Sequence, residues 1–364
     1  MKHQNSMTNF KPVRIVVVGC GAVTTLYYAP ALRMLQELGM LQVIALFDPN
    51  PESVAQLHYT FSRAVRLGSL DQLTCMGAEL VIIASPPRYH AEQTIQALRA
   101  GLSVLCEKPM ATTVAEGRAM VAAAESTSRL LAVGLSRRFF PATRTICDVL
   151  SAGMLGDVVS FKFFEGNDFH WPVASPDSFR KDVAQGGVLL DIGVHTLDLL
   201  SWWWGQPDEV VYEDDAMGGI EANCHIRLRF PQGFRGEVRL SRDWPLPNHY
   251  MIQGTKGWVR WEVNEADRVQ MGPAESQYGL NAQLYENDEA HPACRPAANF
   301  HRSFLAQLRN VVAAVRDQEP LLVSGEDGLQ SLTLIEHCYG HRTLMSMPWL
   351  SETEYQRARQ INAE

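Results

Sequence analysis

The chain has 364 residues, 46% of them hydrophobic, which is enough for two domains that each bury a core. Its formal net charge of -8 argues against a nucleic-acid-binding protein, since such proteins usually carry a surplus of basic residues. Seven widely spaced cysteines with no C-x-x-C pair indicate neither a disulfide framework nor a zinc site. Residues 1–12 are polar and are expected to form a flexible tail, and no uninterrupted apolar run is long enough to span a membrane. We therefore expect a cytoplasmic protein.

The first predicted element is a buried strand at residues 14–18, which is rich in β-branched side chains. It runs into the segment GCGAVT at residues 19–24, and a helix is expected over residues 22–38 with a kink at Pro30. Two glycines let the backbone approach a pyrophosphate, whose charge would rest on the amides at the start of the helix. Thr24 replaces the third glycine of the fingerprint, a position that mainly governs helix–strand packing. The predicted phosphate-binding residues are Gly19, Gly21, Ala22 and Val23.

The second predicted strand covers residues 42–47 and ends in Asp48. An acidic residue at this place in a dinucleotide-binding unit accepts hydrogen bonds from the adenosine ribose. The segment 48–51 (DPNP) is also a turn sequence, and the two interpretations are compatible. Because no Arg or Lys follows closely to receive a 2′-phosphate, the sequence favours NAD over NADP.

Three further apolar runs, at residues 80–84, 103–106 and 130–134, read as strands. They alternate with helical patterns near residues 88–100 and 113–126. Strands that alternate with helices in this way are typical of a parallel sheet, which binds ligands at the carboxyl ends of its strands.

A later segment, residues 186–198 (GGVLLDIGVHTLD), places three titratable side chains in an apolar stretch. If the segment is helical, Asp191, His195 and Asp198 stand at i, i+4 and i+7 and share one face. A carboxylate beside a histidine in a partly dry setting makes an acid/base group, although a structural pair explains the pattern equally well.

Together these motifs resemble the Gfo/Idh/MocA oxidoreductases, named for glucose-fructose oxidoreductase and inositol dehydrogenase. The matching positions are 19–23, 30–32, Asp48, 84–86, His90, 107–109, Arg138, Pro141, Phe179, Arg180, Gly186, Gly187, Asp191, Gly193, His195 and Asp198. Two positions depart from the family pattern, because Tyr28 and Ser136 stand where the family usually has His and Asn.

The resemblance implies an α/β protein, with a Rossmann dinucleotide-binding domain at 13–137 followed by an α/β domain at 138–364. The second domain is expected to have a largely antiparallel open sheet and to bind substrate. Alternating runs support strands near residues 159–163, 210–212, 224–230, 237–240, 249–252 and 258–261. Helical stripes at 300–316 and 329–339 are expected to cover one face of that sheet, and the family implies a homodimer or homotetramer through the other face. Residues 264–298 show no clear period and read as a long excursion.

The resemblance also implies three catalytic residues: Lys108, Asp191 and His195. His195 would accept the hydroxyl proton, Lys108 would stabilise the oxyanion, and Asp191 would orient the substrate hydroxyl or hold the imidazole. The peptide bond between Lys108 and Pro109 is expected to be cis, as the family suggests. The expected cofactor-binding residues are Gly19, Gly21, Ala22, Val23, Asp48, Ser85, Pro86, His90, Glu107 and Lys108.

The expected substrate-binding residues are Lys108, Arg138, Arg180, Asp191 and His195. The basic residues Arg137, Arg138, Arg180 and Lys181 suggest an anionic group on the substrate, although surface ion pairs explain them as well. We expect no metal, because no further ligand accompanies the 191–198 segment and a lysine would compete for the site.

The sequence thus predicts an NAD-dependent dehydrogenase or reductase that acts on a hydroxyl or carbonyl carbon of a sugar, cyclitol or related polar metabolite. One alternative keeps the fold and cofactor but uses transient oxidation for epimerisation, elimination or glycoside cleavage. Another is a non-catalytic NAD-binding sensor, against which the presence of all three catalytic side chains counts.

Overall fold

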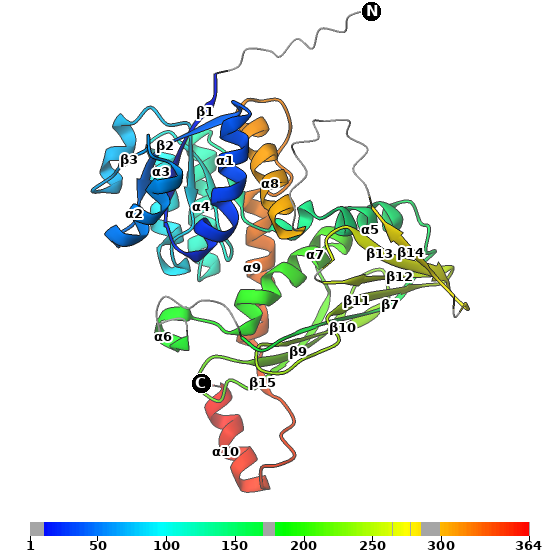
Figure 1. Ribbon diagram of the computed structural model, residues 1–364. Helices are drawn as coiled ribbons and strands as arrows, with labels where there is room; N and C mark the ends of the chain where they lie inside the picture. The colour runs from blue at the N-terminus through cyan, green and yellow to red at the C-terminus, as the bar shows by residue number, and fades with distance from the viewer. Residues whose placement is uncertain (1–10, 170–178, 264, 277, 285–298, 364) are drawn as a thin grey trace, which may run out of the picture.

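The computed structural model describes residues 11–169, 179–263, 265–276, 278–284 and 299–363. Most of the expected N-terminal tail, residues 1–10, lies outside this part of the chain. The described residues form two sheets with helices around and between them (Figure 1).

The N-terminal sheet contains six parallel strands in the order β3-β2-β1-β4-β5-β6, which is the doubly wound arrangement of a Rossmann domain. Its strands are β1 (Val13–Val18), β2 (Leu41–Phe47), β3 (Val65–Arg66), β4 (Leu80–Ile83), β5 (Ser103–Cys106) and β6 (Leu131–Val133). The helical segments between them are η1 (Thr24–Tyr28), α1 (Ala29–Glu37), α2 (Pro51–Thr60), η2 (Leu70–Cys75), η3 (Pro87–Tyr89), α3 (His90–Arg99) and α4 (Val114–Thr127). The predicted strands are confirmed, and the short β3 is an addition that the hydrophobic pattern did not indicate.

The C-terminal sheet contains nine strands in the order β14-β13-β12-β11-β7-β10-β9-β8-β15. All neighbours are antiparallel except the β7–β10 and β8–β15 pairs, so the expected antiparallel character is confirmed. The strands are β7 (Val158–Gly166), β8 (Glu209–Asp214), β9 (Asn223–Arg229), β10 (Arg235–Ser241), β11 (His249–Gly254), β12 (Gly257–Glu262), β13 (Arg268–Pro273), β14 (Leu280–Gln283) and β15 (Thr343–Leu344). The remaining helical segments are η4 (Ser136–Phe139), α5 (Pro141–Ser151), α6 (Lys181–Ala184), η6 (Leu189–Gly193), α7 (Val194–Trp204), α8 (Asn299–Val315), α9 (Gly325–Gly340) and α10 (Glu352–Ala363).

Two expectations about the second half of the chain need correction. The excursion predicted at 264–298 contains strands β13 and β14, which extend the sheet at one edge; residues 285–298 lie outside the described part. Helix α8, expected to cover the second sheet, packs instead beside α1 of the Rossmann domain (Figure 1). Its buried residues Leu308 and Val312 share a core with Leu32 of α1, because the apolar stripe of α8 meets the buried residues of that helix.

Helix α7 covers the inner face of the second sheet with aromatic side chains. Trp204 packs on Phe161, at 5.1 Å between ring centroids, and on the rings of Phe230 and Phe234. The same region contains the one stretch of the described residues, Lys181–Trp204, that is long and apolar enough to cross a membrane by length and composition. Because 61% of its apolar window is buried inside the protein, it fits a core helix and is weak evidence for a span.

Candidate active site

The glycine loop after β1 has the shape that a phosphate site needs. Gly19 has φ +91°, and a Cβ there would lie 2.5 Å from the backbone of Ala84 and Ser85, so only glycine fits between β1 and β4. Gly21 has open space where its Cβ would stand. A dinucleotide pyrophosphate can therefore approach the backbone amides here, and the residues present fit the cofactor that the motif implies.

Asp48 lies at the carboxyl end of β2 and is tied to the glycine loop. Its Oδ2 accepts a hydrogen bond from the Cys20 amide at 2.8 Å, and its Oδ1 accepts one from the Asn50 amide at 2.8 Å. Asp48 can thus stabilise the turn and also bind the adenosine ribose, since each carboxylate oxygen keeps a lone pair for a ribose hydroxyl. The ribose contact itself remains a prediction.

The ends of β4 and β5 are joined by His90. Its Nδ1 lies 2.8 Å from the Pro109 carbonyl oxygen and its Nε2 lies 2.7 Å from that of Ser85. The Lys108–Pro109 peptide bond is cis, as expected. Through these contacts Ser85 and His90 support the segment that carries Lys108, while Pro86 caps η3 next to Ser85.

Glu107 is buried under the same segment. Tyr28 donates a hydrogen bond to its Oε1 at 2.6 Å, and the Lys108 amide donates one to Oε2 at 3.0 Å. Burial raises the pKa of Glu107. Tyr28, which departs from the family pattern, therefore contributes a partner for Glu107.

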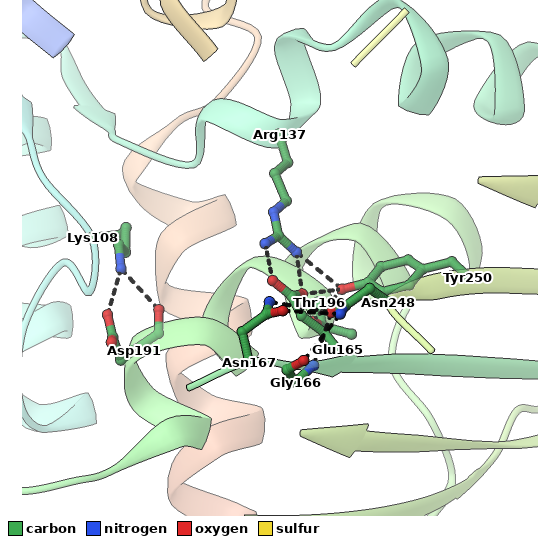
Figure 2. A network of polar contacts seen from close by, with 9 residues as sticks. All are labelled: Lys108, Arg137, Glu165, Gly166, Asn167, Asp191, Thr196, Asn248 and Tyr250. Carbon is green, nitrogen blue, oxygen red and sulfur yellow. Dashed lines mark hydrogen bonds and ion pairs between the residues drawn. The ribbon is translucent and has the colours of Figure 1, made fainter. Parts of the chain in front are cut away.

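Lys108 and Asp191 are in direct contact, as Figure 2 shows. The Lys108 Nζ donates to Asp191 Oδ1 at 2.9 Å and to the Asp191 backbone oxygen at 2.8 Å. Burial would raise the pKa of Asp191, but the charges of Lys108 and of Arg242, whose Nη2 lies 3.1 Å from Oδ2, hold it below its usual value. The carboxylate stays ionised and is a poor proton acceptor.

His195 follows one turn later at the start of α7. Burial lowers the pKa of His195 well below its usual value, and the positive charges of Lys108 and Arg137 lower it further. Its Nδ1 is buried and has no hydrogen-bond partner among the described residues, while Asp191 contacts Lys108 and Arg242. The part of the expectation in which Asp191 holds the imidazole is thus not seen, and the lowered pKa of His195 favours its neutral form.

The segment that carries Asp191 is held at its start by Glu221. The Glu221 Oε1 accepts hydrogen bonds from the amides of Gly187 and Leu189 at 2.9 and 3.0 Å and from the hydroxyl of Tyr339 at 2.8 Å. A Cβ on Gly187 would lie 1.9 Å from the Glu221 carbonyl oxygen, which explains the glycine. The residues after it, η6, form a π-helical turn before α7 begins.

The basic residues before β7 are buried in ion pairs. Arg137 donates to both oxygens of Glu165, at 2.8 and 2.6 Å, and Tyr250 joins the pair (Figure 2). Thr196 completes this network through a 2.6 Å contact between its hydroxyl and that of Tyr250. The network thus holds Thr196, the residue that follows His195, in place.

The remaining predicted residues lie apart from the Lys108–Asp191 pair. Arg138 is 2% exposed and pairs with Asp198 and Asp327 at 2.7 and 2.9 Å, so Asp198 belongs to a separate buried cluster. Arg180 pairs on the surface with Asp182 at 2.6 Å. We therefore leave Arg138 out of the substrate site that we propose. The cation that the sequence analysis missed is Arg242, which no local motif marks.

Comparison with known proteins agrees with this geometry. Residues 13–135 match the model of an oxidoreductase family with an NAD-binding Rossmann fold, and residues 148–342 match the model of its C-terminal α/β domain. The rhizopine catabolism protein MocA of Rhizobium meliloti is 30% identical over 341 residues, which cover 91% of this chain and 94% of MocA. Mouse trans-1,2-dihydrobenzene-1,2-diol dehydrogenase is 31% identical over 228 residues, which cover 60% of this chain and 66% of the mouse protein, just under two thirds of its length.

A solved structure extends the similarity to the whole fold. Levoglucosan dehydrogenase in complex with NADH and levoglucosan superposes with a TM-score of 0.78 over 91% of this chain and 97% of that one, at 21% sequence identity. At this identity the likeness concerns the fold alone.

Proposed function

The chain belongs to the Gfo/Idh/MocA oxidoreductase family, and on this premise we propose that it transfers a hydride between NAD and a hydroxyl-bearing carbon of a sugar, cyclitol or related polar metabolite. The observation that carries the proposal is the contact of Lys108 with Asp191 beside His195, at the same edge of the sheet as the glycine loop. The name of one similar protein, the mouse diol dehydrogenase, supports a substrate that carries hydroxyl groups.

The reaction assigns one task to each side chain. In alcohol oxidation, the neutral imidazole of His195 accepts the hydroxyl proton. The Lys108 ammonium, oriented by Asp191, stabilises the negative charge that grows on the same oxygen. When bound, NAD supplies the hydride acceptor, and Gly19, Gly21 and Asp48 would hold it.

A substrate screen tests the proposal. The full chain is incubated with NAD or NADP and with sugars, inositols, uronates and amino sugars, and the absorbance of NADH or NADPH is followed. We expect net NADH formation with at least one compound and its loss in Lys108→Ala. Conversion of a compound without net NADH would instead support transient oxidation, and cofactor binding without any conversion would support the sensor.

The cofactor preference and the location of the protein belong to the same proposal. Asp48 would repel a 2′-phosphate, and the segment that follows it contains no basic residue before α2, so we propose NAD rather than NADP. We also propose a cytoplasmic location, because the seven widely spaced cysteines without a C-x-x-C pair fit a reducing compartment.

The outer face of the second sheet supports a homo-oligomer. Here β8, β9 and β10 carry ion pairs such as Arg227 with Glu213 at 2.9 Å and Arg229 with Glu209 at 2.9 Å, beside the exposed Val211. We propose that a second copy stacks on this face, which light scattering of the purified chain tests directly. A monomer at all concentrations would contradict it.

A further inference from the structure

Arg242 is a second cation on the catalytic carboxylate. It follows β10 directly and is 9% exposed, and its Nη2 lies 3.1 Å from Asp191 Oδ2. Lys108 occupies the other carboxylate oxygen at 2.9 Å. Asp191 therefore bridges two cations that come from different domains.

The other two buried arginines near the site differ from Arg242 in their partners. Arg137 has Glu165 as its own carboxylate, and Arg138 has both Asp198 and Asp327. Arg242 has only Asp191, which it shares with Lys108, and its Nε is buried with no hydrogen-bond partner among the described residues. A buried guanidinium with an unpartnered donor is costly, so a purely structural role accounts poorly for it.

The surrounding structure holds Arg242 in this place. Its amide donates to the Ala222 carbonyl at 3.0 Å, and its guanidinium lies over the ring of Phe169, 5.5 Å from the centroid. The segment that follows is fixed by Asn248, whose side chain exchanges hydrogen bonds of 2.9 and 3.0 Å with the backbone of Gly166 (Figure 2). The cation is thus preorganised against Asp191.

The net charge of Lys108, Asp191 and Arg242 determines the electric field that the group directs at the substrate. Lys108 and Asp191 alone would be a neutral pair, and the carboxylate would cancel much of the field that the ammonium directs at the substrate oxygen. With Arg242 included, the group carries one positive charge in excess. Two of the three N–H donors of Lys108 bond to Asp191, which leaves one for the substrate oxygen.

We propose that Arg242 is a positioning residue of the reaction, which acts through Asp191: it neutralises the carboxylate that orients Lys108 and so preserves the positive charge of Lys108 for the developing oxyanion. The inference rests on the proposed function. It also has a consequence for His195, because the excess charge disfavours the imidazolium. The charges that lower the pKa of His195 are those of Lys108 after β5 and Arg137 in η4, and Arg242 after β10 contacts Asp191, the partner of Lys108.

Three variants test the proposal. Arg242→Gln removes the charge but keeps a donor for Asp191, and Arg242→Lys keeps the charge. The control is Arg239→Gln, at an exposed position of β10, the strand that precedes Arg242. We expect Arg242→Gln to lower kcat on the order of tenfold to a hundredfold with an unchanged Kd for NAD. In the pH–rate profile of Arg242→Gln, the rise at acidic pH should move to higher pH. Arg242→Lys should recover part of kcat, and Arg239→Gln should behave as the wild type.

A second measurement needs no substrate. An NMR titration of histidine-labelled protein, with His195→Ala used for assignment, should show a higher pKa of His195 in Arg242→Gln than in the wild type. If that pKa and kcat are both unchanged, the proposal is wrong. If the wild type turns over no compound, the proposed function has failed, while the titration still decides whether Arg242 sets the charge at this site. Should Arg242→Gln not fold, Arg242→Lys decides: a kcat as low as that of Lys108→Ala would overturn a role for charge.

Discussion

At the scale of single residues, the candidate site combines a histidine whose neutral form is favoured with a lysine that is paired with a carboxylate. His195 and Lys108 lie in one half-buried setting, yet burial and the neighbouring cations discourage protonation of the imidazole, while Asp191 gives the ammonium a counter-ion. Such a difference between two titratable groups is how one site obtains both acid/base and electrostatic catalysis.

This separation predicts the pH dependence of alcohol oxidation. His195 must be neutral to accept a proton, and its pKa is lowered, so the rate should rise with pH along a limb below pH 6.5 and then level off. His195→Ala should reduce kcat about a hundredfold or more and flatten this limb. Lys108→Ala should also reduce kcat but retain the limb, moved to higher pH because a positive charge near the imidazole is gone. Near-normal turnover of His195→Ala with the same limb would assign the proton to another group.

Asp48 gives a prediction about the cofactor. Asp48→Ser should narrow the preference for NAD over NADP, because it removes a negative charge that repels the 2′-phosphate. Asp48→Asn is the matched control for the loop, since its side-chain oxygen can still accept from the Cys20 amide. Fluorescence titrations with both cofactors measure the ratio. Tighter binding of NADP by the wild type would contradict the assignment.

At the scale of elements, the placement of Asp191 and His195 depends on how one helix begins. Glu221 accepts hydrogen bonds from two amides of the first turn, and Gly187 allows the close approach of the Glu221 backbone. The capping carboxylate comes from the segment between β8 and β9, so the second sheet fixes the start of the catalytic helix.

The corresponding prediction concerns Gly187. Its substitution by Ala should displace the helix start, because the new Cβ would lie 1.9 Å from an oxygen atom. We expect Gly187→Ala to lower kcat strongly, since misplacement by about 1 Å can cost a hundredfold. Binding of NAD should persist because the glycine loop is untouched. Gly340→Ala is the control, since a Cβ there meets nothing within 4 Å. Equal activity of the two variants would show that the helix start tolerates the shift.

At the scale of the whole molecule, α9 packs on elements of both domains. Helix α9 packs against α4 of the Rossmann domain and against α7, which carries His195 (Figure 1). Leu332 of α9 is 2% exposed, and a Cβ on Gly117 of α4 would lie only 3.3 Å from its Cδ2. The proposed site, whose residues come from both domains, depends on this packing.

Leu332→Ala should therefore destabilise the protein. Removing the buried side chain should cost about 2–5 kcal/mol of unfolding free energy, through lost burial and a cavity between the helices. Urea unfolding measures the loss, and Gln330→Ala on the exposed side of the same helix should leave the midpoint nearly unchanged. If the two variants unfold at the same urea concentration, α9 does not hold the domains together.

The sequence by itself determined the features that depend on local patterns. The strand–turn–helix period revealed the parallel sheet, the spacing of Gly19 and Gly21 indicated the phosphate loop, and residues 107–109 and 186–198 marked the catalytic segments. These predictions succeed because backbone conformation and side-chain periodicity are set by neighbours along the chain. The domain limits at 137 and 138 and the roles of the site residues stay predictions.

Only the tertiary structure decided which side chains meet across the fold. Arg242 reaches Asp191 from 51 residues away, and Arg138 reaches Asp198 from 60, so the basic residues before β7 became buried pairs while an unmarked arginine entered the site. Helix α8 carries an ordinary apolar stripe, which fits the Rossmann domain as well as the second sheet. Such contacts depend on shape, burial and the nearest opposite charge in space, and none of these has a signature in the order of neighbouring residues.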